Sequence, residues 1–473
     1  MTNNVVTQVV AKNWCVGCGM CAAVCPKGRL EIRFNDRGEY SPVELESCAE
    51  CGIKCSLCYQ VCPAHGNTKN ETEIGGQLYG DVDGIHQRDE TGYYLSSYVG
   101  HSNVNGHREN GSSGGMATWT IEKLLVMGEV DAVACVGRTT NPDRLFEFQI
   151  CRTPDEIRQC GRSAYYPVET SHVIKHIMEN EGRFAIIGLP CVCKAIRLAQ
   201  DTFPQLKKRI KVLAGLVCGR LASKFFAEYL VARGGGDPHC IQHFEFRRKS
   251  PNEPAKVSFS RCSFTAGEHE NKRFGQVRFS FEWGGGYFKP KGCFYCDDVF
   301  AECADVTFMD AWFKPYSDSP EGNNLVLVRN LCIDKIYGDD NLSCSLSPID
   351  IHIVIHSQQR VVFLKRRRIA VYLRHTKSLL NDSPRVRDFL ISTIHHPIQY
   401  SIERQIMEIS DMTAKAWQHT DKNIELFEKE LSPLLRRLNR YQFLRQFLSI
   451  RFPIIAFQKL SKVISVRLNI KQI

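Results

Sequence analysis

The chain has 473 residues, a length that is typical of two to four domains. Its apolar fraction of 43% and charged fraction of 24% are those of globular proteins, which excludes extensive disorder. The net charge of +10 is unevenly spread, because residues 360–473 carry 22 Lys and Arg against 9 Asp and Glu. The basic character therefore belongs to the C-terminal part of the chain.

Cysteine is the most informative residue type. The chain contains 22 cysteines, and the first residues have neither the basic nor the apolar region of a secretory signal. A reducing, cytoplasmic compartment is therefore expected, in which cysteines bind metal instead of forming disulfides. No apolar run reaches the ~18 residues that cross a bilayer, so membrane contact could only be peripheral.

Four segments follow one another along the chain. Residues 1–75 are turn-rich and dense in cysteine, and a polar, glycine-rich linker separates them from the next segment. Residues 95–335 alternate helical and strand patterns, which is typical of an α/β core with mostly parallel strands. Residues 340–473 have helical periodicity and many basic residues. The expected fold class is an α/β core, with a small α+β ferredoxin-like domain at the N-terminus and a helical C-terminal extension.

Individual elements of the core can be predicted from apolar spacing. Helices are expected at 116–127, 172–180 and 224–232. Buried strands are expected at 130–136, 184–189 and 211–217. Two further segments, 257–264 and 276–283, alternate polar and apolar residues and predict antiparallel strands.

The first cysteine group consists of Cys15, Cys18, Cys21 and Cys25, followed by Pro26. The spacing C-x2-C-x2-C-x3-C-P is that of bacterial ferredoxins, in which three cysteines bind one cluster and the fourth binds the other. Zinc ligands are not usually spaced in this way. The group therefore predicts half of a two-cluster 4Fe–4S module.

The second group is Cys48, Cys51, Cys55, Cys58 and Cys62, followed by Pro63. The pattern expects a cysteine at position 52, where the chain has glycine, so the ligand is either Cys51 or Cys48. We assign Cys15, Cys18, Cys21 and Cys62 to the first cluster. The second cluster is assigned to Cys25, Cys51, Cys55 and Cys58, and a 3Fe cluster is the alternative there.

Several short motifs in the core belong together. A small-residue loop, 112–118, opens a helix and could present free amides to a phosphate. Cys191 and Cys218 each follow a buried strand, where α/β proteins place functional groups, and the pair Cys293 and Cys296 lies in a glycine-rich region. The ordered motifs are SGGMAT, VDAVACV, GRSAYY, AIIGLPC, GLVC, FRRK, CFYC, ADVTFMDAW and GNNLVLV.

This ordered set resembles the beta subunits of the coenzyme F420 hydrogenase/dehydrogenase family, and with the cysteine-rich segment it covers about residues 10–335. The resemblance implies an N-terminal family domain at 95–185 and a C-terminal one at 186–335. Members are iron–sulfur flavoproteins, including deazaflavin-reducing subunits and bacterial proteins in polysaccharide-synthesis settings. The serine-rich loop and the long tail of this chain depart from the deazaflavin-reducing members, which puts coenzyme F420 as its substrate in doubt.

The resemblance implies a third 4Fe–4S cluster, whose ligands would be Cys191, Cys218, Cys293 and Cys296. Cys193 and Cys303 are spare thiols nearby. Seven other cysteines are interpreted as structural: Cys135, Cys151, Cys160, Cys240, Cys262, Cys332 and Cys344. The resemblance also implies FAD. The residues expected to hold it are Ser113, Gly114, Gly115, Thr118, Ser163, Tyr165 and Arg138. Lys249, in the FRRK motif, could bind an acidic substrate or a phosphate, or it could belong to a solvated turn.

The basic tail allows two interpretations. Residues 361–372 place basic side chains between apolar runs, and residues 431–447 and 452–466 are amphipathic. The tail could lie on anionic lipid as an interfacial helix. Alternatively it could form a helical hairpin that packs on the body or on a partner. Nucleic acid is not expected, because no binding motif is present.

Two functions follow from these features. The first is a flavin- and iron–sulfur-dependent oxidoreductase, in which FAD exchanges hydride with a small-molecule donor or acceptor, with F420 as one candidate, and clusters relay electrons. The second is an electron-transfer subunit without its own substrate, which delivers electrons to a redox partner protein. No catalytic residue is identified by either hypothesis.

Overall fold

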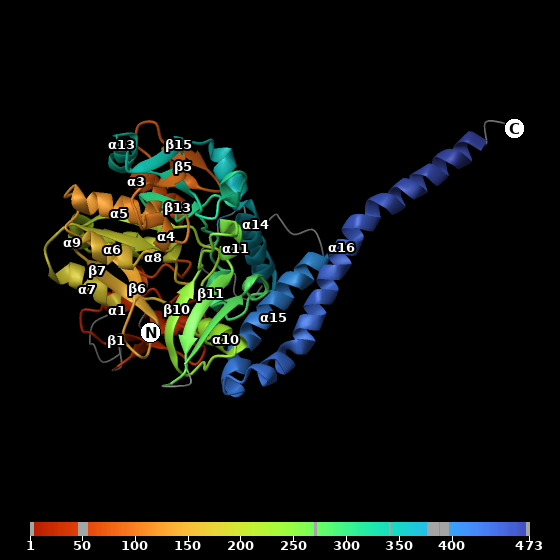
Figure 1. Cartoon of the computed structure of the whole chain (residues 1–473), viewed down its shortest axis with the longest axis horizontal. Coiled ribbons are helices and arrows are strands. Elements are labelled where there is room, and N and C mark those ends of the chain that lie inside the picture. Colours follow the sequence, from red (N-terminus) through yellow and green to blue (C-terminus); the bar gives the residue numbers. More distant parts are fainter. Residues whose placement is uncertain are drawn as a thin grey trace.

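The computed structural model describes residues 4–45, 55–268, 272–339, 342–375, 387 and 397–469 of the chain. Within these ranges the side chains are described except those of residues 258, 372–375, 397 and 448–469. Its centre is an eight-stranded sheet with the strand order β15-β5-β14-β13-β9-β8-β6-β7 (Figure 1). In chain order these strands are β5 (Ser96–Ser102), β6 (Ala132–Arg138), β7 (Phe146–Cys151), β8 (Phe184–Gly188), β9 (Ile210–Leu216), β13 (Val306–Asp310), β14 (Asn324–Val328) and β15 (Cys344–Pro348).

The central strands of this sheet are parallel and the outer ones antiparallel. Strands β6, β8, β9 and β13 run parallel, with Ala134 opposite Ile186 and Ile187 opposite Ala214. The pairs β6–β7, β13–β14, β14–β5 and β5–β15 are antiparallel. The expected parallel core is therefore present at the middle of a mixed sheet.

Helices cover both faces of the sheet, because alternate residues of each strand point to opposite sides. On one face Val133, Ala185 and Val306 pack with α5 (Met116–Val126), α6 (Pro154–Gln159) and α13 (Leu331–Asp339). On the other face Ala134, Ile186 and Leu213 pack with α1 (Met20–Ala23), α7 (Ser171–Glu179), α8 (Pro190–Thr202) and α9 (Pro204–Arg209). The short helix α4 (His107–Asn110) precedes α5.

A smaller antiparallel sheet is built from β10 (Ile241–Phe246), β11 (Arg261–Ala266) and β12 (Arg273–Arg278). Phe244 and Phe264 belong to an aromatic core that it shares with α10 (Phe225–Arg233) and with the hairpin of α15 (Pro397–His419) and α16 (Ile424–Asn469). Shorter helical turns in this part of the chain are α11 (Ala255–Ser258), α12 (Ser280–Gly284), η4 (Lys291–Phe294) and η5 (Tyr316–Asp318).

The N-terminal segment docks on the main sheet. It contains a hairpin of β1 (Leu30–Phe34) and β2 (Tyr40–Glu44), and Thr170 donates from its backbone N and its Oγ1 to the carbonyl of Cys18, at 2.9 and 2.7 Å. The other elements of this part are η1 (Val6–Val10), α2 (Leu57–Gln60), α3 (Glu71–Tyr79), β3 (His86–Arg88) and β4 (Gly92–Tyr94). A ferredoxin-type fold for residues 1–75 stays a prediction, since residues 46–54 lie outside the described part.

Most of the expected elements of the core are confirmed. The three helices are found as α5, α7 and α10, and the three buried strands as β6, β8 and β9. The antiparallel pair is found as β11 and β12, but at Arg261–Ala266 and Arg273–Arg278 instead of the expected 257–264 and 276–283. Residues 255–258 and 280–284 are helical instead. At the second of these segments Phe279 and Trp283, four residues apart, both turn inwards onto Phe226.

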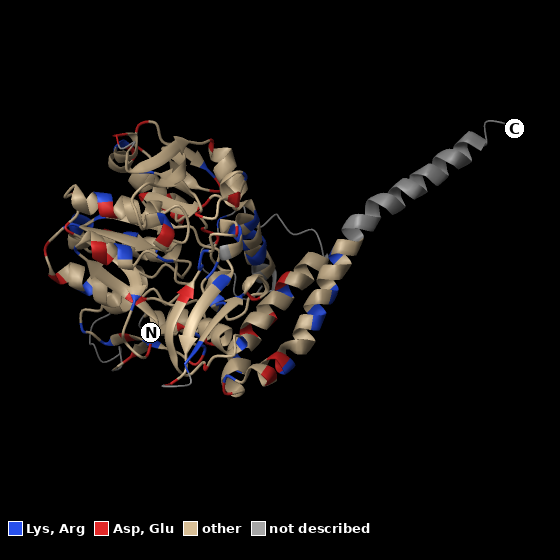
Figure 2. Ribbon diagram, viewed as in Figure 1, with Lys and Arg blue, Asp and Glu red and all other residues tan. Residues whose placement is uncertain are grey.

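The basic run of the tail lies inside the protein. Helix α14 (Ile351–His375) carries many basic residues (Figure 2), but Arg367 and Arg368 are each 8% exposed. Both guanidinium groups bind Glu403 of α15, which is fully buried, with N–O distances of 2.5 and 2.8 Å. Leu431 and Leu438 of α16 are also fully buried. Arg367 and Arg368 therefore pack on the body, as the hairpin interpretation expects, and their buried guanidinium groups do not face lipid.

Among the described residues, none of the helices has the length and apolar character that a membrane span requires.

Replacing Glu403 by glutamine is expected to destabilise the protein by about 3–5 kcal/mol, because two buried guanidinium groups lose their shared carboxylate. The measurement is the thermal unfolding midpoint of E403Q against the wild type. Glu408→Gln is the matched control, since Glu408 pairs with Arg404 on the exposed side of the same helix. Equal midpoints for E403Q and the wild type would show that this ion pair does not hold the tail.

Candidate functional site

The first group of thiols is gathered in the N-terminal segment. Burial raises the pKa of the Cys21 thiol well above its ordinary value, and the neighbouring thiols of Cys18, Cys15 and Cys62 raise it further. These are the four cysteines assigned from the spacing to one cluster. Gly17, at φ 68°, lets its amide donate to Cys15 Sγ at 3.3 Å. The four thiols line a small cavity whose other walls are mainly apolar, including Val5, Val9, Pro42 and Pro63.

The second group lies beside the first. Burial raises the pKa of the Cys58 thiol, and the nearby thiols of Cys55 and Cys25 also raise it. Cys25 thus lies with the second group and Cys62 with the first, which is the crossed arrangement that the spacing predicts. The remaining candidates, Cys51 and Cys48, lie outside the described residues.

The third group is assembled at the carboxyl ends of two parallel strands. Cys191 is the second residue of α8, the helix that follows β8, and Cys218 follows β9. Burial and then the thiols of Cys218, Cys296 and Cys293 raise the pKa of Cys191. Four thiols that are far apart in the sequence therefore converge on one buried place. The structure brings together all four residues that the resemblance implied.

Buried cations surround this third group. Lys365 of α14 is 3% exposed, and its Nζ lies 3.5 Å from Cys296 Sγ and donates to the Asp298 carbonyl at 2.6 Å. Lys289 is 1% exposed, and its pKa is lowered far below the usual range by burial and by neighbouring arginine and lysine. Its Nζ lies 3.9 Å from the centre of the Phe294 ring, and the nearby Cys293 thiol opposes the lowering of its pKa.

Arg220 is the third cation. Burial lowers its pKa to about 9, and it donates to the carbonyls of Leu221 and Trp283 at 3.0 and 2.9 Å. The groups that oppose this lowering are the Cys293 and Cys218 thiols. Buried cations without carboxylate partners are costly. A negatively charged group among these four thiols would remove that cost, so the residues fit an anionic cluster bound by thiolates.

The three thiol groups are neighbours in space. The Cys58 thiol of the second group raises the pKa of Cys21 in the first group. The Cys18 thiol of the first group raises the pKa of Cys191 in the third. Cys218 of the third group in turn raises the pKa of the Tyr165 hydroxyl. Thiols of neighbouring groups, and Cys218 with Tyr165, therefore lie close enough to interact electrostatically.

The small-residue loop of 112–115 lies against the main sheet. Ser113 Oγ donates to the Asn323 carbonyl at 2.7 Å, and the Met116 amide donates to Asn324 Oδ1 at 3.0 Å. A Cβ atom on Gly114 would lie 2.7 Å from the Asn324 backbone nitrogen, so glycine is needed for this packing. The Met116 amide, which was expected to be free for a phosphate, is therefore already hydrogen-bonded within the protein. Gly115 caps α5, and Thr118 is buried within it.

A cavity of about 270 Å³ lies next to this loop, between the end of β6 and β10. Ser163 and Arg138 line it, and the Ser163 amide donates to Ser112 Oγ at 3.0 Å. Its other walls include Asn110, Gly161, Arg162 and Phe246. Among the expected flavin residues, Ser113, Gly114, Gly115, Thr118 and Tyr165 do not line it. Its volume lies just below the ~300–1,000 Å³ that is usual for ligand pockets.

Tyr165 belongs to an aromatic cluster. Its ring centroid lies 4.5 Å from that of Trp283 and 5.4 Å from that of Phe246. Burial raises the pKa of its hydroxyl to about 12, while the nearby Arg247 acts in the opposite direction. Arg247 is buried and pairs with Asp310 at 2.7 Å. Tyr165 therefore sits between the third thiol group and a buried ion pair.

Lys249 was expected to bind an acidic substrate or a phosphate, or to lie in a solvated turn, and the structure shows a third arrangement. Its Nζ donates to the carbonyls of Ser113 and Glu321, at 2.7 and 2.6 Å, and to that of Arg108. Burial, Arg247 and Arg108 lower its pKa to about 7. Lys249 thus holds the small-residue loop instead of lying in a solvated turn.

The sequence interpretation missed Lys365, Lys289 and Arg220. None belongs to a recognisable motif, and Lys365 is 69 residues from its partner Cys296. The only signal for Lys365 was the basic character of residues 361–372. That character was interpreted either as a lipid-binding surface or as part of a packed helical hairpin.

Two family models match the chain. Residues 97–175 match the coenzyme F420 hydrogenase/dehydrogenase beta subunit N-terminal model, and residues 181–343 match the C-terminal model. The strands of both segments pair in one sheet, because β6 of the first lies beside β8 of the second.

Curated relatives are distant in sequence. The coenzyme F420-dependent sulfite reductase of Methanocaldococcus jannaschii is 23% identical over 68% of this chain and 45% of its own length. A subunit of the F420H2 dehydrogenase of Methanosarcina mazei is 22% identical over 45% of this chain and 55% of its own length. The chain thus spans about half the length of these two proteins.

Two further matches are shorter or weaker. An uncharacterised ferredoxin of M. jannaschii is 36% identical over 50 residues, which are 11% of this chain and 65% of the ferredoxin. A chain of the F420-reducing [NiFe] hydrogenase complex from Methanosarcina barkeri is 15% identical, with a TM-score of 0.47 over 63% of this chain and 98% of its own length.

The lowered pKa of Lys249 predicts a pH dependence of stability. Between pH 7 and about 10.5 the unfolded chain keeps a proton that the folded chain has lost, so stability contributed by this group rises with pH in that range. Below pH 7 both states are protonated and the full cost of burying the charge remains. In Lys249→Gln this rise is lost, and the thermal midpoint of the wild type increases relative to the variant as the pH is raised.

The matched control for this measurement is Lys256→Gln, because Lys256 forms an exposed pair with Asp318 on a neighbouring segment. Its midpoints should follow those of the wild type at every pH. Parallel curves for K249Q and the wild type between pH 7 and 10 would contradict the assignment of this titration to Lys249.

Proposed function

Because this chain belongs to the family of coenzyme F420 hydrogenase/dehydrogenase beta subunits, we propose that it is an iron–sulfur flavoprotein oxidoreductase. Bound FAD would supply hydride exchange with a substrate or coenzyme, with F420 as one candidate, and 4Fe–4S clusters would supply single-electron transfer. The observation that carries the proposal is the convergence of Cys191, Cys218, Cys293 and Cys296 among buried cations.

The residues of this chain have separate tasks in that function. The thiols of Cys191, Cys218, Cys293 and Cys296 would bind the third cluster, and Lys365 would stabilise its negative charge. The apolar walls around the first thiol group would exclude water there. Tyr165, whose hydroxyl interacts electrostatically with the Cys218 thiol, would lie between the third cluster and the flavin.

The flavin would be held at the cavity beside the small-residue loop. Ser163 and Arg138 line that cavity and could bind polar groups of the ligand, with Lys249 fixing the loop behind it. Ser113, Gly114, Gly115 and Thr118 would act by shaping this loop, since they pack on the sheet and on α5.

The second candidate function is an electron-transfer subunit without its own substrate. The name of the M. mazei relative, which describes one subunit of a dehydrogenase, favours it, and so does the small volume of the cavity. In that case a redox partner protein would receive the electrons. The presence of bound FAD distinguishes the two functions.

Anaerobically purified wild-type protein is expected to contain about twelve irons, as much labile sulfide, and one FAD per chain. Cys293→Ala should lose about four irons and keep the others, because it removes a ligand of the third group only. Cys240→Ala is the control and should keep all the iron, since Cys240 lies outside the three groups. A wild-type protein with about eight irons and no flavin would refute the third cluster and the hydride chemistry.

Replacing Lys365 by glutamine is expected to lower the midpoint potential of the third cluster by on the order of 100 mV, because a buried positive charge no longer stabilises the reduced form. The measurement is a redox titration followed by electron paramagnetic resonance. Lys415→Gln is the control, since Lys415 is exposed on α15 and pairs with Asp411. An unchanged potential in K365Q would show that Lys365 does not act on the cluster.

A further inference from the structure

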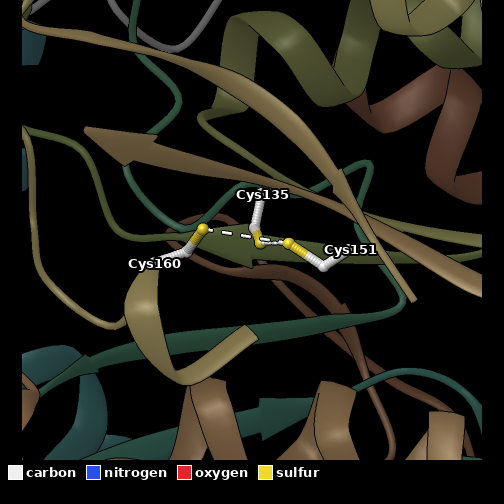
Figure 3. Close-up of side chains that lie close together, drawn as sticks. All are labelled: Cys135, Cys151 and Cys160. Carbon is white, nitrogen blue, oxygen red and sulfur yellow. Dashed lines mark hydrogen bonds between the residues drawn. The ribbon is translucent and has the colours of Figure 1, made fainter. Parts of the chain in front are cut away.

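Three cysteines outside the expected cluster ligands meet at the edge of the main sheet. Cys135 lies on β6, Cys151 ends β7, and Cys160 directly follows α6. The register places Cys135 opposite Gln149 and Cys151 opposite Val133, so the first two cysteines are diagonal neighbours on one face of the sheet. Helix α6 then returns the chain over that face and brings Cys160 to them. Figure 3 shows the three sulfur atoms pointing toward one another.

The sulfur–sulfur distances match a mononuclear metal site. Cys135 Sγ lies 3.5 Å from Cys151 Sγ, which lies 3.9 Å from Cys160 Sγ, and all three sulfurs are within 4.8 Å of one another. With a metal–sulfur bond of about 2.3 Å, two thiolates at tetrahedral positions are about 3.8 Å apart. A disulfide would require about 2.05 Å. All three cysteines are free.

The surrounding residues leave room for this arrangement. A Cβ atom on Gly137 would lie 2.8 Å from Cys160 Sγ and 2.7 Å from Gln149 Oε1, so only glycine lets both side chains lie over β6. Gln149 Oε1 accepts from Cys160 Sγ at 3.7 Å, so a polar side chain lies beside the third sulfur.

One side of the group is closed and the other open. Cys135 and Cys151 are each 2% exposed and belong to the apolar core under α5. Cys160 is half-buried and lines the cavity of about 270 Å³. Three protein ligands with one open position is the pattern of zinc sites that take an exchangeable ligand, whereas closed structural sites have four.

We propose that Cys135, Cys151 and Cys160 bind one thiophilic d10 ion, Zn²⁺ or Cu⁺, with the fourth position facing Gln149 and the cavity. Thiolates select these soft ions. Binding breaks three S–H bonds, releases three protons and forms three metal–sulfur bonds, without any change of oxidation state. The site is separate from the iron–sulfur and flavin proposals and does not rest on them.

The test is the zinc and copper content of the full-length, anaerobically purified protein, measured by mass spectrometry together with its iron. About one zinc or copper per chain is expected in the wild type, and at least about tenfold less in Cys160→Ser with unchanged iron. Cys240→Ser is the matched control, because Cys240 is a half-buried cysteine outside the group, and it should keep the metal. X-ray absorption of the wild type should give three sulfur neighbours at about 2.3 Å.

A second measurement does not depend on a variant. Wild-type protein stripped of zinc and copper is labelled with N-ethylmaleimide, and labelling of Cys160 is followed by peptide mass spectrometry with and without added Zn²⁺. Labelling is expected to slow by at least about tenfold when Zn²⁺ is present. The proposal fails if the wild type takes up neither ion, if C160S retains the metal or loses iron with it, or if Zn²⁺ does not protect Cys160.

Discussion

Buried positive charge beside buried thiols is the constraint on which the rest of this structure depends. Lys289 and Arg220 lie in the interior, and among the described residues the main groups that favour their charged forms are thiols. A charge in such a place persists only if a counter-charge is present. Lys365 satisfies the same requirement from the far end of the chain and so fastens α14 to the body. The C-terminal part is therefore a component of the third thiol group as well as a cover for the core.

The fold meets this constraint by fixing the loops that carry the thiols. Parallel strands β8 and β9 end at the same edge of the sheet, which places Cys191 and Cys218 together. The segment after Cys296 is held by Arg329, fully buried, which donates to the carbonyls of Phe300 and Ala304 at 3.2 and 3.1 Å. Asp305 then accepts from the Leu213 amide at 2.7 Å and so joins that segment to β9. Hydrogen bonds from these buried charged side chains thus fix the loops, which have no regular secondary structure of their own.

Sequence alone predicted what depends on local spacing. The C-x2-C pattern identified the thiols of the first group, and apolar runs identified the strands that present Cys191 and Cys218. Contacts between distant residues carry no such pattern. For the run that contains Lys365, lipid contact and packing on the body both stayed open, because its charge is visible in the sequence and its partner is not. The group of Cys135, Cys151 and Cys160 was interpreted as structural for the same reason, since its intervals of 16 and 9 residues match no motif and arise from the β6–β7 register.

The loop from Cys160 to Ser163 connects the two proposed ligand sites. Cys160 and Ser163 line the same cavity, and the Ser163 amide is bonded to Ser112 of the small-residue loop. A change in the position of Cys160 would be transmitted to Ser163 through only two intervening residues. An ion bound by the three thiols would fix one end of this short loop, and a ligand in the cavity would contact the other. Gly137 and Cys160 form part of the cavity wall that would face a flavin. The position of this wall would therefore depend on the close packing at Gly137 and on the ion that the three sulfur atoms would bind.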